Sequence, residues 1–181
     1  MAALSYGESS GYDMAKTFDV TVANFWTATP QQLYRELDKM EAAGLIEARV
    51  VEQVKRPNKR LFSLTGEGRA ALRDFTVRPP KPTAIRDELL VQVEAMDLGD
   101  VASVRAHVQD KLAASEIKLK RYERTRDFLL DGRSEQVYLA EQDRLGPYLT
   151  LARGISFELE TIRWCGFVLA TLADRTPNAD V

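Results

Sequence analysis

The chain has 181 residues, of which 45% are hydrophobic and 29% charged, and this balance fits a globular protein of one or two small domains. With 25 Lys and Arg residues against 27 Asp and Glu residues, the net charge is -2, so any nucleic-acid binding must come from a local basic patch. A single cysteine and a single histidine exclude an intrachain disulfide framework and zinc sites that need several Cys and His ligands. No stretch approaches about 20 uninterrupted apolar residues, and no signal-peptide pattern opens the chain. We therefore expect a cytoplasmic protein without a membrane span.

A proline cluster at residues 79–82 (PPKP) divides the sequence into two parts of different character. Proline fixes φ and lacks a backbone donor, so residues 79–83 are expected to form a stiff, extended linker. Residues 1–78 mix helical and strand-like patterns and carry a slight excess of positive charge, whereas residues 84–181 are helical almost throughout and slightly negative. The sequence therefore predicts two domains.

The first helical pattern follows Ser9 and Ser10, whose hydroxyls are suited to capping a helix. Apolar side chains then recur at steps of three and four residues, which predicts a short helix with one buried face. The positions on that face are Tyr12, Ala15, Phe18 and Val22. Tyr12 is accordingly expected in the core.

A helix over residues 30–43 has stronger local signals. Thr29 offers a capping hydroxyl, Pro30 suits the first helical position, and Gln32 at the third position completes a capping box. Gly44 supplies a left-handed stop. The expected buried stripe consists of Leu33, Leu37 and Met40.

The opposite face of this helix is polar and has the chemistry to read DNA. Glutamine can bond adenine at two atoms and arginine can bond guanine in the same way, so Gln31, Gln32 and Arg35 are predicted to read bases. Lys39 and the hydroxyl of Tyr34, whose ring borders the apolar stripe, are predicted to contact phosphates. Asp38 on the same face would repel DNA, which concentrates contact in the first turns. The pattern alone equally fits the solvated face of an amphipathic helix.

After Gly44 the apolar period changes to about two, with Ile46, Ala48 and Val50 alternating with other residues, and a second short apolar run covers residues 61–64. Residues 53–60 between the runs (QVKRPNKR) contain a Pro-Asn turn and no acid. This pattern predicts a β-hairpin with a cationic tip. Its predicted phosphate contacts are Lys55, Arg56, Lys59 and Arg60. The alternative is a soluble loop whose lysines discourage pairing at the sheet edge.

Thr65 caps a further helix, so the order is helix, capped helix, two-stranded ribbon, helix. This is the order of a winged helix-turn-helix, in which the second helix enters the major groove and the ribbon reaches the neighbouring backbone. The predicted fold class is mainly α, formally α+β: an N-terminal winged helix-turn-helix domain followed by a helical, coiled-coil-like domain.

The residues of the first part resemble the PadR-like transcriptional regulators. The segments that carry the resemblance are SGYDMAK at 10–16, FW at 25–26, QQLYREL at 31–37, EAAGLI at 41–46, PNKR at 57–60 and TGEGR at 65–69. The second part resembles the C-terminal helical domain of the branch related to virulence-gene activators. The positions concerned are Tyr148, Arg153, Gly154, Ile155, Phe157, Glu158 and Trp164.

This resemblance implies a homodimeric regulator of bacterial transcription, usually a repressor, whose C-terminal helices form the dimer. Some members of this family respond to small, often aromatic, effectors. The sequence departs from the family at its start, because only residues 1–6 precede the turn at 7–9, where family members usually have a longer first helix.

The apolar residues of the second part are spaced as in helices that pack into a dimer. Between 101 and 129, positions at alternating steps of three and four form a coiled-coil-like seam with two polar members, and a helix that starts near Pro147 repeats the spacing. Three helices, near 84–96, 101–130 and 148–172, cannot cover all these apolar faces, so a second copy of the chain is predicted. The predicted dimer seam contains Leu112, Leu119, Tyr122, Ile155, Leu159 and Ile162. Two wings on a twofold axis would bind pseudo-palindromic DNA with half-sites roughly 34 Å apart or a multiple of that.

Phe157, Trp164 and Val168 form a second stripe on the last helix, and the first two are predicted to line either an effector pocket or the dimer core. Cys165 is expected to be a small buried hydrophobe and His107 a surface residue. No Gly-rich phosphate loop, nucleophile elbow or metal cluster is present in the sequence, so neither an enzyme, nor a cofactor, nor a metal is expected. The leading prediction is a dimeric regulator that binds double-stranded DNA, and the alternative is a winged-helix module that contacts protein.

Overall fold

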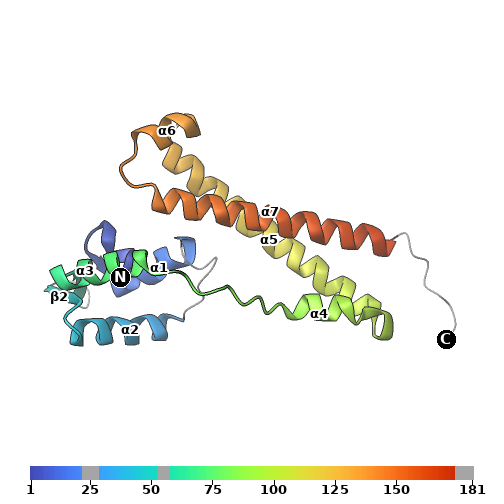
Figure 1. Ribbon diagram of the computed structural model, residues 1–181. Coiled ribbons are helices and arrows are strands. Elements are labelled where there is room, and N and C mark those ends of the chain that lie inside the picture. Colours follow the sequence, from blue (N-terminus) through green and yellow to red (C-terminus); the bar gives the residue numbers. More distant parts are fainter. Residues whose placement is uncertain (22–28, 53–57, 174–181) are drawn as a thin grey trace. The chain divides into compact units, whose positions relative to one another are not determined.

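The computed structural model describes residues 1–21, 29–52 and 58–173. The chain divides into two compact units, Met1–Pro82 and Thr83–Val181 (Figure 1). Residues 79–87, which include the proline cluster, have no helix or strand.

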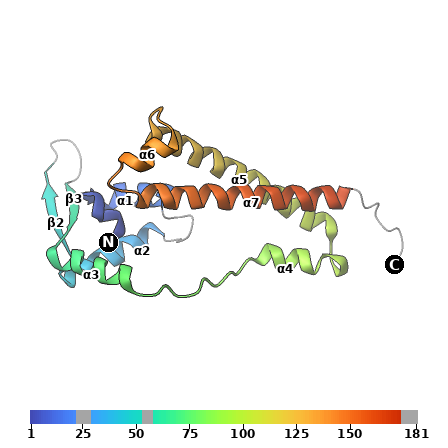
Figure 2. The ribbon, with the colours of Figure 1, turned by 45° about the horizontal axis from the view of Figure 1, so that its top comes forward.

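The first unit is a small sheet surrounded by helices. Its elements are the 3-10 helix η1 (Ala2–Tyr6), β1 (Ser9–Ser10), α1 (Gly11–Thr21), α2 (Pro30–Ala42), β2 (Ile46–Val51), β3 (Lys59–Leu64) and α3 (Gly66–Val77). The sheet is antiparallel with the order β1-β3-β2, and β2 pairs with β3 from Ile46 opposite Leu64 to Val51 opposite Lys59. Figure 2 shows β2 and β3 as one long hairpin. The predicted winged helix-turn-helix order is confirmed.

The predicted start and stop of α2 are confirmed. The Thr29 hydroxyl accepts a hydrogen bond from the Gln32 backbone N–H at 3.2 Å, and the Thr29 N–H donates to Gln32 Oε1 at 2.8 Å. Pro30 occupies the first turn, where its missing N–H has no partner to lose. Gly44 has φ of 70°, the left-handed conformation that glycine adopts without a Cβ penalty.

The core of the winged unit combines side chains from η1, α1, α2, β2, β3 and α3. Its buried members are Leu4, Met14, Leu37, Ile46, Phe62 and Leu64, with Leu33, Met40 and Leu72 among the partly buried side chains packed against them. Leu4 belongs to η1, so the short segment before β1 does the packing expected of a first helix.

The expected core position of Tyr12 is wrong. Tyr12 is 71% exposed, and Met14 is the α1 side chain that enters the core. Val50 is also exposed, because the hairpin there has left the core and has no apolar surface opposite it. The predicted positions Phe18 and Val22 lie outside the residues whose side chains the structure describes.

The second unit is built on two long antiparallel helices. Its elements are α4 (Glu88–Glu94), the 3-10 helix η2 (Met96–Leu98), α5 (Val101–Leu130), α6 (Glu135–Glu141) and α7 (Gly146–Ala173). The sequence did not predict α6, which has only seven residues and is capped by Ser134. A hydrogen bond from the Tyr148 hydroxyl to Glu135 Oε1 at 2.9 Å ties α6 to the start of α7.

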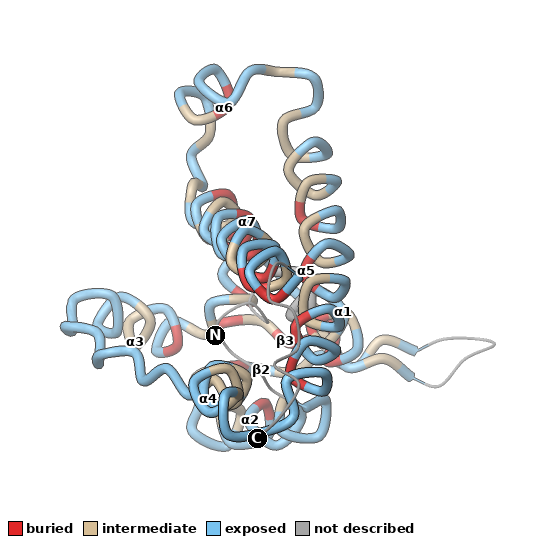
Figure 3. The backbone as a smooth tube through the Cα atoms, turned by 90° about the vertical axis from the view of Figure 1, so that its right-hand side faces the viewer, coloured by how far each residue is buried: buried red, intermediate tan, exposed pale blue. Residues whose placement is uncertain are grey.

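The apolar stripe of α5 packs against α7 of the same chain. The buried segments of the two helices, red in Figure 3, lie on the sides that face each other. One core contains Val108, Cys165, Val168 and Leu172, and a second contains Tyr122, Leu151 and Ile155. The expected burial of Cys165 is confirmed, and burial raises the pKa of its thiol.

This packing corrects the predicted seam at two positions. Tyr122 has 0% exposure and Ile155 is buried within one chain, so neither has surface left for a second copy. Leu112 and Leu119 pack at the edges of the same intrachain cores. Leu159 is exposed and Ile162 is partly buried, so these two remain available to a partner. Val168, predicted on the second stripe, lies in the core because it faces α5.

A charged pair lies within the packing of α5 and α7. Glu158 is 2% exposed and accepts an ion-pair contact from Lys118 Nζ at 2.8 Å. Burial opposes the charge of Lys118, but the hydrogen bond and the negative charge of Glu158 outweigh it, so the pKa of Lys118 is raised. The sequence pattern did not predict this pair.

Candidate nucleic-acid interface

The outward face of α2 exposes the three predicted base readers. Gln31, Gln32 and Arg35 are all exposed, in the first turns of the helix. The Arg35 guanidinium makes no hydrogen bond or ion pair with the residues that the structure describes. Its donors are therefore free to meet an acceptor from another molecule.

Gln32 also caps the start of α2, and this limits its capacity to read bases. Its amide oxygen accepts the Thr29 N–H in the capping box. A bidentate contact to adenine needs both the oxygen and the nitrogen of the amide, so Gln32 cannot make one while the cap stands. At the start of α2, Gln31 and Arg35 can therefore use all their hydrogen-bonding groups in contacts with DNA bases.

Tyr34 connects α2 to α1. Its ring lies against the backbone of Gly11, the first residue of α1, while nearly half of the side chain stays exposed. The ring therefore packs inward in part, as its place at the border of the stripe predicts.

The later turns of α2 carry several acids, and the basic side chains there are paired with them. Lys39 Nζ lies 2.7 Å from Glu36 Oε1. Arg60, on the neighbouring strand β3, contacts Glu41 at 2.6 Å and Asp38 at 3.8 Å. Asp38 is exposed, as expected, and these acids favour contact with DNA at the start of α2 over its end.

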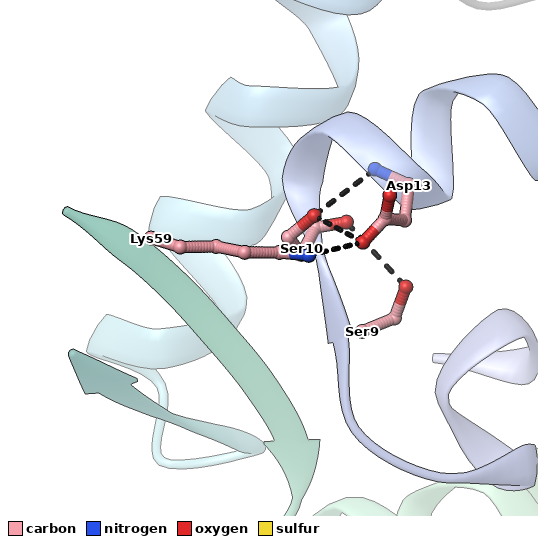
Figure 4. Close-up of polar contacts among 4 residues, drawn as sticks. All are labelled: Ser9, Ser10, Asp13 and Lys59. Atoms are coloured by element: carbon pink, nitrogen blue, oxygen red, sulfur yellow. Dashed lines mark hydrogen bonds and ion pairs between the residues drawn. The ribbon is translucent and has the colours of Figure 1, made fainter. Parts of the chain in front are cut away.

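The loop end of the β2–β3 ladder, where Lys59 pairs with Val51, is attached to α1 through Asp13 (Figure 4). Its Oδ2 accepts a hydrogen bond from Lys59 Nζ at 2.7 Å and another from the Ser10 hydroxyl at 2.8 Å. The bond from Lys59, and then the bond from Ser10, hold the pKa of Asp13 below its ordinary value. Lys59 thus connects the start of β3 to the first turn of α1. On the neighbouring strand, Arg49 pairs with Glu8 at 2.6 Å.

The sequence did not indicate the intrachain partners of the cations that were predicted to contact phosphates. Lys55 and Arg56, at the predicted tip, lie outside the described residues. The pairs of Lys39, Lys59 and Arg60 are at least partly exposed, and exposed ion pairs contribute only about 0–1 kcal/mol. Such cations can exchange a carboxylate for a phosphate at small cost.

The residues predicted for an effector pocket do not gather in one core cluster. Phe157 is 46% exposed and lies under the guanidinium of Arg153, 5.6 Å from its ring centroid. Trp164 is partly buried against the core around Cys165. His107 is on the surface, as expected, with its Nδ1 3.0 Å from Gln92 Oε1.

Residues 1–21, 29–52 and 58–173 contain neither a membrane-spanning helix nor a set of side chains suited to a metal ion. No helix there is long and apolar enough to cross a membrane. No group of three or more His, Cys, Asp and Glu side chains in the same ranges could hold a metal ion.

The chain matches two family models, one in each unit. Residues 1–74 match the transcriptional regulator PadR-like family, and residues 85–173 match the virulence activator alpha C-term family. A protein of Mycobacterium tuberculosis named as a probable transcriptional regulator is 32% identical, with 92% of each chain covered.

Solved structures of two further proteins are similar to the whole chain. Bacillus subtilis PadR in complex with operator DNA has a TM-score of 0.77 at 26% identity, covering 94% of this chain and 93% of the other. The same protein in complex with p-coumaric acid has a TM-score of 0.69 at 25% identity, covering 96% and 95%. The Vibrio cholerae virulence activator AphA has a TM-score of 0.68 at 27% identity, covering 95% and 94%.

Proposed function

Because the chain belongs to the PadR-like family of transcriptional regulators, we propose that it binds operator DNA through the first turns of α2 and the hairpin of β2 and β3. The observation that carries this assignment is the exposed start of α2, where Arg35 has no partner among the described residues. Arg35 and Gln31 read base edges. Gln32 holds the start of the helix with its amide oxygen, so only the donors of its amide nitrogen can reach a base.

The hairpin and the border of α2 position the module on the DNA backbone. Lys55, Arg56, Lys59 and Arg60 supply positive charge to phosphates, and so do Lys39 and the hydroxyl of Tyr34. The pairs of Lys59 with Asp13 and of Arg60 with Glu41 are compatible with this role, because they are partly exposed and cost little to exchange for contacts with phosphates. Each contact releases counterions, so affinity falls as salt rises.

We also propose a homodimer that binds a pseudo-palindromic operator and represses transcription. Large apolar side chains of the second unit remain exposed, including Leu159 of the predicted seam. Exposed apolar patches of this kind mark interaction sites, and a second copy of the chain would cover them. A twofold pair presents two α2 helices to successive turns of DNA.

A small effector would regulate the dimer from its helical unit. The supporting observation is the complex of the similar Bacillus subtilis PadR with p-coumaric acid. We propose Phe157 and Trp164 as candidate walls of the effector site. An effector that changes the spacing of the two α2 helices would weaken binding to a site of fixed half-site spacing.

This function requires no catalysis, and we propose that the protein is not an enzyme. It would act in the cytoplasm, at the nucleoid, where its operator lies. The alternative, a winged-helix module that contacts protein, is less well supported because the exposed start of α2 is polar. A salt-insensitive protein partner and no binding to DNA would favour that alternative.

A mobility-shift titration tests the assignment. An operator is first selected from genomic DNA with the purified chain. Arg35→Ala should lose about 1–3 kcal/mol on the operator and much less on scrambled DNA, since a bidentate base contact is worth that much in discrimination. The quadruple variant with Lys55, Arg56, Lys59 and Arg60 all changed to Ala should weaken binding to both probes and reduce the slope against salt. Equal losses of Arg35→Ala on both probes would contradict its reading role.

A further inference from the structure

The two described cations of the hairpin are each held by an acid from a helix, whereas the base reader Arg35 is not. Lys59 Nζ lies 2.7 Å from Asp13 Oδ2 (Figure 4), and the Arg60 guanidinium lies 2.6 Å from Glu41 Oε2. Asp13 is in the first turn of α1 and Glu41 in the last turn of α2, so both pairs join β3 to a helix. The Arg35 guanidinium has no such partner among the residues that the structure describes. Phosphate contact and base contact therefore begin from different electrostatic states.

The acids compete for the cations that would contact phosphates. A carboxylate and a phosphate both accept charge-assisted hydrogen bonds from lysine and arginine. The four side chains of the two pairs are between 35% and 48% exposed, so a phosphate can reach either cation. When a phosphate takes the cation, the acid is left as an uncompensated negative charge beside the DNA backbone and repels it. Each acid therefore opposes contact between the hairpin and DNA, whether the cation keeps its carboxylate or exchanges it.

Further charges act on the two pairs unequally. Asp38 lies 3.8 Å from Arg60, so Arg60 keeps an acidic neighbour when Glu41 is neutralised. Asp13 has the positive charge of Lys16 nearby as well as that of Lys59. Neutralising Asp13 therefore uncovers more positive charge than neutralising Glu41.

Binding to DNA of any sequence depends almost entirely on neutralised phosphates, and a regulator meets a large excess of non-operator sites. Given the DNA binding proposed for this chain, we propose that Asp13 and Glu41 limit the affinity of the winged unit for DNA of any sequence. They do so by competing with phosphates for Lys59 and Arg60. Arg35 reads bases without such a competitor among the described residues.

Fluorescence anisotropy of a labelled duplex of scrambled sequence, titrated with the full chain at several salt concentrations, tests this role. The double variant Asp13→Asn with Glu41→Gln should bind the duplex about tenfold more tightly at low salt, because small gains at two positions of each chain multiply. Its affinity should also fall more steeply with salt, by roughly 0.9 in slope for each cation that gains a phosphate. Asp74→Asn with Glu160→Gln is the matched control, since it removes two negative charges at exposed positions outside α2 and the hairpin. The control should bind as the parent does.

Two single variants separate the charge of the acids from their effect on the fold. Asp13→Glu keeps the carboxylate and should bind scrambled DNA as the parent does. A purely structural role of Asp13 would instead make Asp13→Glu and Asp13→Asn both weaken binding, with no change in salt slope. Glu41→Gln alone should give a smaller gain in the same direction as the double variant, because Asp38 remains beside Arg60. This variant keeps the test decisive if Asp13→Asn melts below the temperature of the assay.

The proposal is overturned if the double variant binds scrambled DNA no more tightly than the parent, if its salt slope is unchanged, or if the control gains as much. It is also overturned if the gain occurs on the operator alone, since every sequence carries the same phosphates. If neither the parent nor the double variant binds any duplex at low salt, the proposed DNA binding fails and this inference fails with it. Binding by the parent without a gain in the double variant overturns this inference alone.

Discussion

Glu158 is a charged side chain whose burial is compensated by one partner. Its carboxylate depends on the ammonium group of Lys118, which remains partly open to water. A buried pair of this kind contributes little net stability when it is intact, but removal of one partner leaves an uncompensated charge. The pair is therefore expected to decide how α5 and α7 are aligned more than how tightly they pack.

Lys118→Met should destabilise the helical unit by about 1–3 kcal/mol, because Glu158 loses its charged hydrogen-bond partner. The double variant with Glu158→Gln should recover part of that loss, since the amide is neutral. Urea unfolding followed by circular dichroism measures both. Glu160→Gln, which breaks an exposed pair with Arg163, is the control and should change little. If Lys118→Met is as stable as the parent, the pair has no structural role.

Asp13 predicts how the winged unit responds to acid. Its pKa is lowered in the folded chain by Lys59 and Ser10, so the folded state holds its proton less tightly than the unfolded state does. The resulting stabilisation is present above the unfolded value, about pH 4, and is lost as pH falls through the folded value. Asp13→Asn removes the titrating group.

The melting temperature of Asp13→Asn should therefore lie below that of the parent at about pH 6 and approach it at about pH 3. Thermal melts across this range measure the difference. Asp74→Asn, at an exposed position without a partner among the described residues, should show no such convergence. A constant gap for Asp13→Asn would show that the bond to Lys59 does not form in solution.

At the scale of elements, α3 is held against the turn after α2 by a close backbone contact. A Cβ added at Gly68 would stand 3.0 Å from the carbonyl carbon of Leu45 and closer still to its oxygen. Backbone atoms cannot yield as a flexible side chain can, so α3 would have to move. The Thr65 cap and the packing of Leu72 would move with it.

Gly68→Ala should accordingly destabilise the winged unit by about 1–3 kcal/mol, the usual cost of overpacking. Gly66→Ala offers a matched control on the same helix, because an added Cβ there meets nothing within 4 Å. It should leave stability unchanged or raise it slightly. Thermal melts of both variants decide the matter, and equal melting temperatures would contradict the close approach.

Local signals predicted α2 well because its start and stop depend on residues within a few positions of each other. Thr29, Pro30, Gln32 and Gly44 all act as their types suggest. The outward side chains were correctly placed on the exposed face, but their partners were not predictable. Whether Arg60 meets Glu41 or a phosphate depends on how β3 packs beside α2, and no short window of sequence contains that information.

At the scale of the whole molecule, dimerisation decides how the two wings address DNA. The cores around Tyr122 and Cys165 form within one chain, so the dimer interface must use residues that remain exposed. Leu159 is such a residue from the predicted seam. A substitution at Leu159 is therefore a direct test of the homodimer.

The full chain should sediment as a dimer at micromolar concentration. Leu159→Glu should shift it toward the monomer without loss of helix content, because the burial of a charge at an interface is costly. Val50→Glu, at an exposed apolar position of β2, is the control and should remain dimeric. A folded monomer for the parent chain would exclude the twofold pair.

The sequence by itself determined that the chain has two parts, divided at the proline cluster. It also determined the winged helix-turn-helix order of the elements, the caps of α2 and the polar character of the outer face of α2. These features follow from short-range rules of capping, turn chemistry and periodicity. Only the tertiary structure decided that the α5 stripe packs on α7 of the same chain, that Met14 replaces Tyr12 in the core, and that Glu158 is buried beside Lys118. An apolar or charged side chain does not specify its partner, because partners from distant parts of the chain meet only when the helices pack.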